Sequence, residues 1–99
     1  MRAVDKLTLM RWREMDAIVV LKAFADHVKE DRSFHPITSR QTSRWHAHVA
    51  GRDWELLCTD QKFLDVRAEH GGGGAIDMVM HLYGLPFKAA VALLTEKGL

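Results

Sequence analysis

The spacing of hydrophobic positions predicts a helix in the first third of the chain, from about Asp16 to Lys29. Asp16 precedes the apolar positions and can cap the start of this helix. The segment before it, "DKLTLMRWRE", either extends the helix or forms a separate one that begins at Asp5 or Thr8, so residues 1–15 are treated as an N-terminal extension. The positions that recur at helical spacing are Ile18, Leu21, Ala25 and Val28, with Phe24 beside them.

Between Phe34 and Val66 the hydrophobic period changes from helical to alternating, which is typical of half-buried strands. The stretches "RWHAHVA", "WELLC" and "KFLDV" predict three strands, joined by turns at "GRD" and "TDQ". "SFHPI" predicts a short fourth strand at the sheet edge, where the missing N–H of Pro36 is tolerated. The side chains that alternate toward one side of the first two strands are Trp45, Ala47, Val49, Trp54, Leu56 and Cys58.

Two short amphipathic helices are predicted in the last third of the chain. The first ends at Gly84, because glycine readily adopts the left-handed conformation of a helix end. The second has Pro86 at its first helical position, where the missing N–H costs nothing, and closes at Gly98. Together the patterns predict an α+β domain that spans residues 1–99: a small antiparallel meander of three to four strands, an N-terminal helix and two C-terminal helices. The apolar helix positions are Ile76, Val79, Met80 and Tyr83, then Phe87, Ala90, Val91 and Leu94.

Composition narrows the class of protein. A chain of 99 residues that is 47% hydrophobic and 27% charged is expected to fold as one small domain. The single cysteine, Cys58, excludes an internal disulfide and a zinc site built from several thiolates. No apolar run approaches the roughly 18 residues of a membrane span, and no signal-peptide pattern is present. We therefore expect a cytoplasmic protein without a membrane partner.

Charge is distributed unevenly, although the net charge is only +1. The segment from Arg32 to Arg52, "RSFHPITSRQTSRWHAHVAGR", holds four arginines and three histidines but no Asp or Glu. Such a tract can follow a phosphate backbone, with Trp45 available to stack on a base. The alternative is an ordinary solvated loop and edge strand, and the sequence leaves both open.

Four consecutive glycines, Gly71 to Gly74, precede the first C-terminal helix. One interpretation is a phosphate site, because free N–H groups at a helix start bind anions. The run lacks the Gly-Lys-Ser/Thr ending of a Walker loop and the Gly-x-Gly-x-x-Gly fingerprint of a dinucleotide site, so we favour a sharp corner. There the glycines permit positive φ and close approach of strand and helix, and Asp77 complements the helix dipole.

The histidines raise the question of a metal. His46 and His48 share one side of a predicted strand, a spacing that can chelate a metal if His35 or His70 joins them. A structural zinc site normally needs four ligands, so we favour exposed histidines that face solvent or nucleic acid, and expect no metal or other cofactor. The histidines predicted to lie within helices, at the surface or its boundary, are His27 and His81.

Catalysis finds little support in the pattern. No Ser-His-Asp or Cys-His spacing is present, and an inward-facing Cys58 behaves as a small hydrophobic residue. The carboxylate pairs Asp53/Glu55 and Asp60/Asp65 fall in predicted turns and strand exteriors, where solvation explains them. We therefore expect that the protein is not an enzyme.

The segment "GGGGAIDMVMHLYGLPFKAAVALL" resembles the end of the zinc-binding domain of bacterial DNA primases. In that family a Gly-Gly stretch leads into a helix with Asp and Met, followed by Gly-Leu-x-Phe-x-x-Ala-Val-x-x-Leu. The likeness is strong over about a quarter of the chain and weaker from Asp16 onward through "SRWHAHV" and "KFLDVRAEHGGGG". The N-terminal primase-like module of Toprim-containing proteins of plasmids and integrative elements is similar in "TSRWH" and "GGGGAID".

The resemblance also shows a departure. Val66 and Glu69 stand where the primases carry their second cysteine pair. At the position of the first pair, His35-Pro36 is the nearest counterpart. The zinc site is therefore expected to be absent. Packing must then replace the metal, since burying one large apolar side chain contributes about 2 kcal/mol. The candidates for this role are Trp45, Trp54, Phe63, Leu64 and Val66.

In the primase family this domain helps to select and position single-stranded template. The resemblance therefore implies a non-catalytic module that binds nucleic acid, most simply single-stranded DNA, in replication or maintenance of a mobile element. Trp45 and Phe63 are expected to stack on bases if they are exposed. The residues expected to contact nucleic acid are Arg40, Arg44, Trp45, His46, His48, Arg52, Lys62, Phe63 and Arg67.

Two alternatives stay open. In the first, the module docks onto a primase, helicase or Toprim partner without touching nucleic acid, through a patch of apolar side chains on the terminal helices. The residues of that patch would be Met78, Leu82 and Leu93. The second alternative is residual metal binding, and its candidate ligands are His35, His46, His48 and Glu69.

Overall fold

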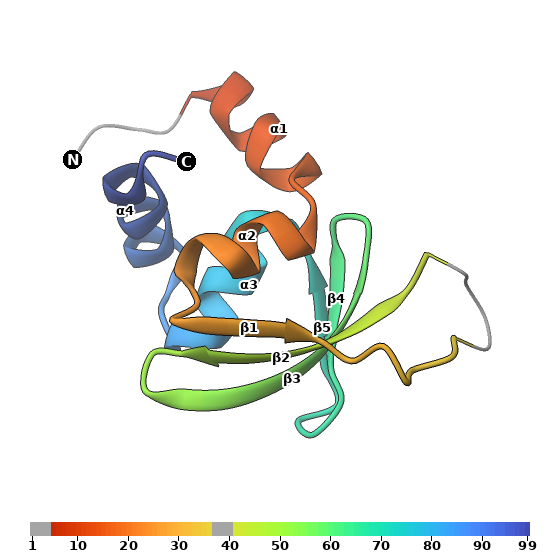
Figure 1. Ribbon diagram of the computed structural model, residues 1–99. Helices are drawn as coiled ribbons and strands as arrows, with labels where there is room; N and C mark the ends of the chain where they lie inside the picture. The colour runs from red at the N-terminus through yellow and green to blue at the C-terminus, as the bar shows by residue number, and fades with distance from the viewer. Residues whose placement is uncertain (1–4, 37–40) are drawn as a thin grey trace.

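A computed structural model describes residues 5–36 and 41–99 of the chain, and within them the expected α+β class is confirmed (Figure 1). The strands form one antiparallel sheet in the order β1-β2-β3-β4-β5, a simple meander with five strands instead of the three to four predicted. The elements are α1 Lys6–Glu14, α2 Ala17–Phe24, β1 His27–Glu30, β2 Ser43–Val49, β3 Arg52–Thr59, β4 Lys62–Asp65, β5 His70–Gly73, α3 Gly74–Tyr83 and α4 Phe87–Lys97.

The N-terminal region forms two helices, as one of the two sequence interpretations allowed. The Asp5 side chain accepts a hydrogen bond of 2.8 Å from the Thr8 N–H and caps α1, which ends at Glu14. α1 belongs to the domain, because Trp12 is buried in the common core. The sequence was wrong about where the next helix ends, since α2 stops at Phe24.

The residues that follow α2 form the edge strand β1. Val28 pairs with Ala47 of β2. This apolar residue is compatible both with the helical spacing of the preceding segment and with a place in a strand. The pairing with β2 makes this segment a strand and not a continuation of α2. The predicted edge strand "SFHPI" is not a strand in its described part, because the Asp31 carboxylate accepts hydrogen bonds from the Ser33 N–H and hydroxyl and turns the chain there. Ile37 lies outside the described residues.

β2, β3 and β4 confirm the three strands predicted from alternation. Trp45 pairs with Leu56 and Ala47 pairs with Trp54, with all four side chains buried on one face. The β2–β3 turn lies one residue earlier than predicted, because Ala50 adopts a φ of 53° and Gly51 a φ of 74°, which match a two-residue hairpin turn.

The glycine run forms both a strand and a corner. His70–Gly73 pairs with β4 as a fifth strand, which the sequence did not predict because glycine is depleted in strands. The expected corner is confirmed at Gly74, whose φ is 89°. A Cβ atom there would lie 2.9 Å from the Arg13 Cα, so only glycine lets α1 approach the start of α3 this closely.

The helices lie on one side of the sheet. α2 contacts β1 and β3, while α1 and α4 pack against α3 (Figure 1). Met78 and Leu82 of α3 are 1% and 3% exposed and Leu93 is half-buried, so the predicted apolar docking patch is instead part of the core or packed against it. α3 and α4 end at Gly84 and Gly98, both with positive φ, as predicted.

No single helix in the described part of the chain is long and apolar enough to cross a membrane. α3 and α4 reach that length and composition only as a pair, which is bent by 106°.

Candidate nucleic-acid interface

The face of the sheet opposite the helices carries the central part of the basic tract. Side chains alternate along a strand, so Arg44, His46 and His48 of β2 point away from the face that buries Trp45 and Ala47. The strand register then sets their neighbours. His48 lies between His27 of β1 and Asp53 of β3, and His46 lies between Lys29 and Glu55.

Carboxylates from neighbouring segments accompany these basic residues. Arg44 Nη2 lies 2.5 Å from Glu55 Oε2, and its Nε lies 3.9 Å from Asp31 Oδ2. The two ring nitrogens of His46 each lie 3.7 Å from one of the same two carboxylates. His48 Nδ1 lies 2.9 Å from an oxygen of the exposed Asp53. The tract from Arg32 to Arg52 contains no acidic residue, but in the folded structure carboxylates from outside the tract lie beside its basic side chains.

This network holds Arg44 in place and partly neutralises it. Arg44 Nε is buried and has no hydrogen-bond partner within the described structure. The hydrogen bond that anchors the guanidinium is the one that Nη2 donates to Glu55. Hydrogen bonds from Ser33 lower the pKa of the Asp31 carboxyl, with smaller contributions from His46 and Arg44, so Asp31 stays ionised at neutral pH.

Two shallow hollows adjoin the edge strand β1, and the first extends around that edge to Lys22 of α2 and Trp45 on the helix-covered side. The first, of about 920 Å³, includes Lys22, Lys29 and Arg32 in its lining, together with Glu30 and Asp31. The second, of about 800 Å³, includes His27, His48 and Arg67, together with Asp53. Lys29 and His46 line both, so the two hollows join. Among the described residues no carboxylate lies within 4.0 Å of the charged nitrogens of Lys22, Lys29, Arg32 or Arg67.

The two aromatic residues proposed to stack on bases are buried. Trp45 is 9% exposed, its Nε1 donates to the Ser43 hydroxyl, and the Lys22 ammonium lies 5.2 Å from its ring centroid. Phe63 is 4% exposed and lies beside the His81 ring. The condition for stacking is not met at either position, because both rings lie on the face that the helices cover.

The other residues predicted to contact nucleic acid do not lie together on one part of the sheet. Arg52 lies at the start of β3, with its Cζ 4.7 Å from the Trp54 ring centroid. Lys62 lies at the opposite end of the sheet, since it pairs with Thr59 at the end of β3. Arg67 reaches the second hollow from the turn between β4 and β5. Arg40 lies outside the described residues. The structure thus gathers Arg44, His46, His48 and Arg67 but not Arg52 and Lys62.

A buried aspartate–histidine pair was missed. Asp65 is 4% exposed, and its Oδ2 lies 2.7 Å from His81 Nε2. Its other oxygen accepts from the Ala68 N–H at 3.2 Å, and the His70 ring stacks on His81 at 4.5 Å. Asp65 is therefore not on a strand exterior, whereas His81 lies at the boundary of the core, which the prediction of a surface or boundary position allowed. The missed signal is the alternation in "KFLDV", which places Asp65 on the same side as the buried Phe63.

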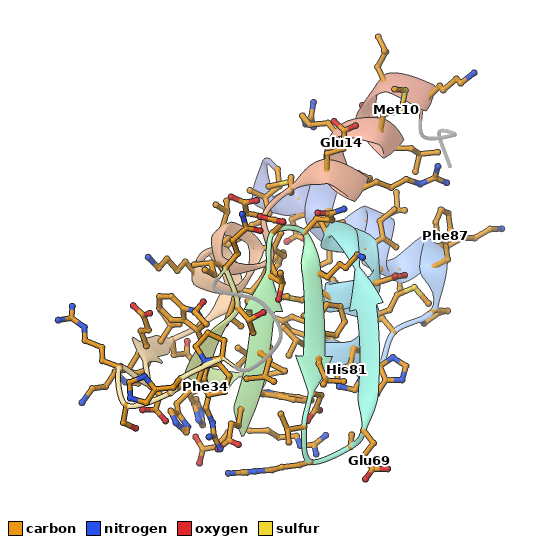
Figure 2. The ribbon with its side chains drawn as sticks, turned by 90° about the vertical axis from the view of Figure 1, so that its right-hand side faces the viewer. Met10, Glu14, Phe34, Glu69, His81 and Phe87 are labelled. Carbon is orange, nitrogen blue, oxygen red and sulfur yellow. The ribbon has the colours of Figure 1, made fainter. Side chains whose placement is uncertain are left out.

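The electrostatics of this pair favour an ionised carboxylate. Burial acts to raise the pKa of Asp65, but hydrogen bonds from His81 and from the Ala68 N–H outweigh it, so the pKa is lowered. The pair joins the end of β4 to α3 beside the turn where the primase resemblance places cysteines, and Figure 2 labels His81 and Glu69 in this region. Leu64 and Val66 are 41% and 40% exposed, so they do not replace a metal by packing, whereas Trp45, Trp54 and Phe63 are buried.

The structure also bears on the candidate metal site, the candidate phosphate site at the glycine run, and the Cys58 thiol. No group of three or more His, Cys, Asp or Glu side chains in the described ranges is arranged to hold a metal ion. Asp77 Oδ2 accepts from the Gly73 N–H at 3.1 Å, and the Gly74 N–H donates to the Gln61 carbonyl, so these two N–H groups at the start of α3 are already hydrogen-bonded beside a carboxylate that repels phosphate. Burial raises the pKa of the Cys58 thiol to about 12, which keeps it protonated.

Comparison with known proteins gives little further information. No protein-family model matches the chain, and no solved structure matches it. A protein described as "65 kDa protein" from Zymomonas mobilis subsp. mobilis is 39% identical over 44 residues. The match covers 44% of this chain and only 8% of that protein. This likeness does not establish a family.

Proposed function

We propose that this chain is a zinc-less relative of the primase zinc-binding domain and acts as a non-catalytic, cytoplasmic module that binds single-stranded DNA. Two independent observations support the proposal. The motif from Gly71 to Leu94 resembles that family, and the sheet has an open face on the side away from the helices. Its role would lie in replication or maintenance of a mobile element.

The observation that carries the proposal is the pair of joined hollows along β1 and β2. Lys22, Lys29 and Arg32 reach the first hollow without a carboxylate within ion-pairing distance among the described residues. These three cations outnumber the two carboxylates of the same lining, Glu30 and Asp31, so a phosphate backbone can supply further negative charge, and release of its counterions would drive binding. Arg44 and His46 are held by carboxylates, so they contribute shape and position more than net charge.

The geometry also favours a particular kind of recognition. With Trp45 and Phe63 buried, base stacking on those rings does not contribute. Binding through Lys and Arg to phosphates positions a strand but does not read its sequence. We therefore expect weak sequence preference and strong dependence on salt.

The test is a titration of fluorescein-labelled oligo(dT) followed by anisotropy at increasing salt. Binding at low salt that weakens steadily as salt rises supports the proposal. Anisotropy that stays flat at low salt would contradict it and favour the alternative, docking onto a primase, helicase or Toprim partner. That alternative has its own observation: Leu7 and Met10 of α1 are 78% and 47% exposed, and Figure 2 places Met10 on the part of α1 far from the sheet.

A further inference from the structure

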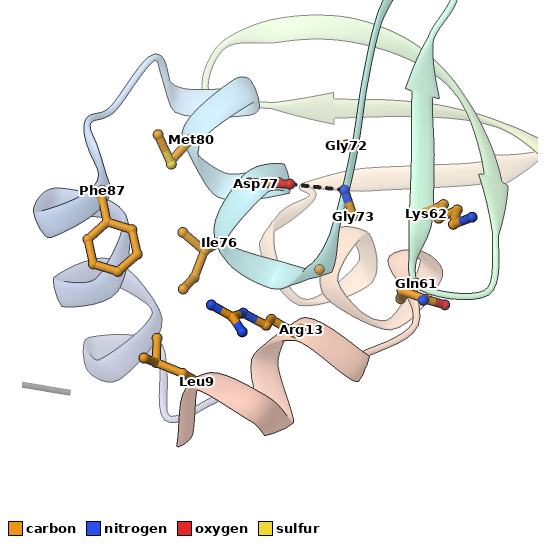
Figure 3. A pocket seen from close by; sticks show the side chains of 11 residues that line it. Leu9, Arg13, Gln61, Lys62, Gly72, Gly73, Ile76, Asp77, Met80 and Phe87 are labelled. Carbon is orange, nitrogen blue, oxygen red and sulfur yellow. Dashed lines mark hydrogen bonds between the residues drawn. The ribbon is translucent and has the colours of Figure 1, made fainter. Parts of the chain in front are cut away.

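A separate pocket of about 510 Å³ lies between α1, the corner where β5 meets α3, and the start of α4 (Figure 3). Its apolar lining comes from all three elements and includes Leu9, Ile76, Met80 and Phe87. Phe87 is 49% exposed, which is unusual for a ring at the edge of a core and leaves it accessible from solvent. The pocket adjoins β5, at the opposite edge of the sheet from β1 and from the hollows described above.

Two cations line this pocket, Arg13 and Lys62, and neither has a carboxylate within ion-pairing distance among the described residues. Figure 3 shows the Arg13 side chain directed from α1 between Leu9 and Ile76, toward Phe87. Within the described part of the chain, no carboxylate lies within 4.0 Å of the Arg13 guanidinium. Asp77 also lines the pocket, but its carboxylate accepts from the Gly73 N–H. An apolar pocket with an uncompensated guanidinium is complementary to a ligand that combines an apolar group with a carboxylate.

The wall formed by β5 adds backbone groups to this site. The Gly74 N–H points toward β4, where it donates to the Gln61 carbonyl. Because hydrogen-bonding direction alternates along a strand, the peptide groups of Gly71 and Gly73 point outward from the sheet edge. The Gly73 N–H already donates to Asp77, so the Gly73 carbonyl and the peptide group of Gly71 are the ones that face an added strand. The glycines carry no side chains that would keep another backbone away. Edge strands of this kind accept an added extended polypeptide.

We propose that this pocket binds an extended segment of a partner polypeptide that carries a bulky apolar residue next to a carboxylate. The apolar side chain would lie against Leu9, Met80 and Phe87, and the carboxylate would pair with Arg13. A nucleic-acid strand fits less well, because Asp77 places a negative charge beside the glycines. The inference concerns a different surface from the joined hollows and does not rest on DNA binding there.

The test uses two synthetic hexapeptides of sequence Gly-Leu-Phe-X-Leu-Gly, in which X is Glu or Lys. Each is titrated into the ¹⁵N-labelled full chain, and amide chemical shifts are recorded. We expect the Glu peptide to shift resonances of Gly71, Gly73 and Phe87 and to bind about threefold to fivefold more tightly than the Lys peptide, the range for a partly exposed ion pair. Shifts confined to the β1–β2 face, no shifts at millimolar peptide, or equal binding of the two peptides would overturn the proposal.

Two charge-reversal variants sharpen the result. Arg13→Glu should invert the preference so that the Lys peptide binds better, whereas Arg32→Glu, the same charge change on the far side of the molecule, should leave the Glu preference intact. Spectral dispersion of both variants reports whether they fold. A parallel titration with oligo(dT) separates the two surfaces. If the oligonucleotide shifts Gly73 and Phe87 in place of Lys29 and Arg32, the pocket is a nucleic-acid site and the peptide proposal fails.

Discussion

His81 Nε2 lies 2.7 Å from Asp65 Oδ2, and this contact ties α3 to the end of β4. Both side chains are largely buried, at 15% and 6% exposed, and the rings of His70, Trp54 and Phe63 surround the imidazole. We propose that this pair and its aromatic neighbours hold the hairpin at the place where the resemblance to the primase domain puts a metal site.

Removing one partner of this pair should destabilise the fold strongly. We expect Asp65→Ala or His81→Ala to lower the free energy of unfolding by about 2–4 kcal/mol, because each leaves a buried polar group without its partner. A double-mutant cycle measured by urea unfolding should show a coupling of about 1–3 kcal/mol. The matched control is the surface pair His48–Asp53, where Asp53→Ala should cost no more than about 1 kcal/mol. Equal losses at the two sites would contradict the assigned role.

The same carboxylate should make stability depend on acid pH. The pKa of Asp65 is lowered in the folded state, so its contribution to stability is present above the unfolded value of about 3.9 and is lost as pH falls through the folded pKa. The difference in unfolding free energy between wild type and Asp65→Asn should therefore shrink as pH falls from about 5 toward 3. Urea titrations across that range measure it, and a difference that grows at low pH would reverse the predicted sign.

Gly74 should tolerate a side chain far less well than Gly51, although both have positive φ. Gly51→Ala meets nothing within 4 Å and should cost only the backbone strain of about 1 kcal/mol. Gly74→Ala adds a Cβ that would lie 2.9 Å from the Arg13 Cα, and the overpacking should cost about 1–3 kcal/mol more. Thermal unfolding of the two variants compares them directly. Similar losses would mean that α1 does not approach the corner as described.

Metal removal should leave the fold unchanged. No group of three or more His, Cys, Asp or Glu side chains in the part of the chain that the structure describes is arranged to bind a metal. Purified protein should therefore contain no stoichiometric zinc, and its Tm should not change after dialysis against EDTA. Elemental analysis beside calorimetry checks both points. One zinc per chain, with a Tm that falls on chelation, would revive the histidine-based metal alternative.

The sequence predicted the parts of the fold in which the hydrophobic positions follow a single period, either that of a helix or that of a strand. Alternation around Trp45 and Trp54 identified β2 and β3, and helical spacing bounded by Gly84 identified α3 and α4. It failed where one residue fits two patterns, as Val28 does, and where pairing overrides propensity, as in the glycine strand β5. Those outcomes depend on contacts between segments distant in sequence, which local spacing does not encode.

The candidate interface was predicted only in part, for a related reason. The tract from Arg32 to Arg52 contains no acidic residue, but strand pairing places Glu55 and Asp53 beside it, and the turn at Asp31 adds a third carboxylate. Linear charge patterns do not show such cross-strand neighbours. Lys22 and Lys29, which have no carboxylate within 4.0 Å among the described residues, were missed because they belong to α2 and β1, outside the basic tract.

The most direct test of the account is the salt dependence of oligo(dT) binding by wild type, Lys29→Glu/Arg32→Glu and Lys88→Glu/Lys97→Glu. The two double variants change net charge equally, but only the first alters the hollows on β1 and β2. We expect wild type and the α4 variant to bind with similar slopes, and the β1 variant to lose most of its affinity and about 0.7 in slope for each phosphate contact removed. Equal loss in both double variants, or no binding by wild type at low salt, would contradict it.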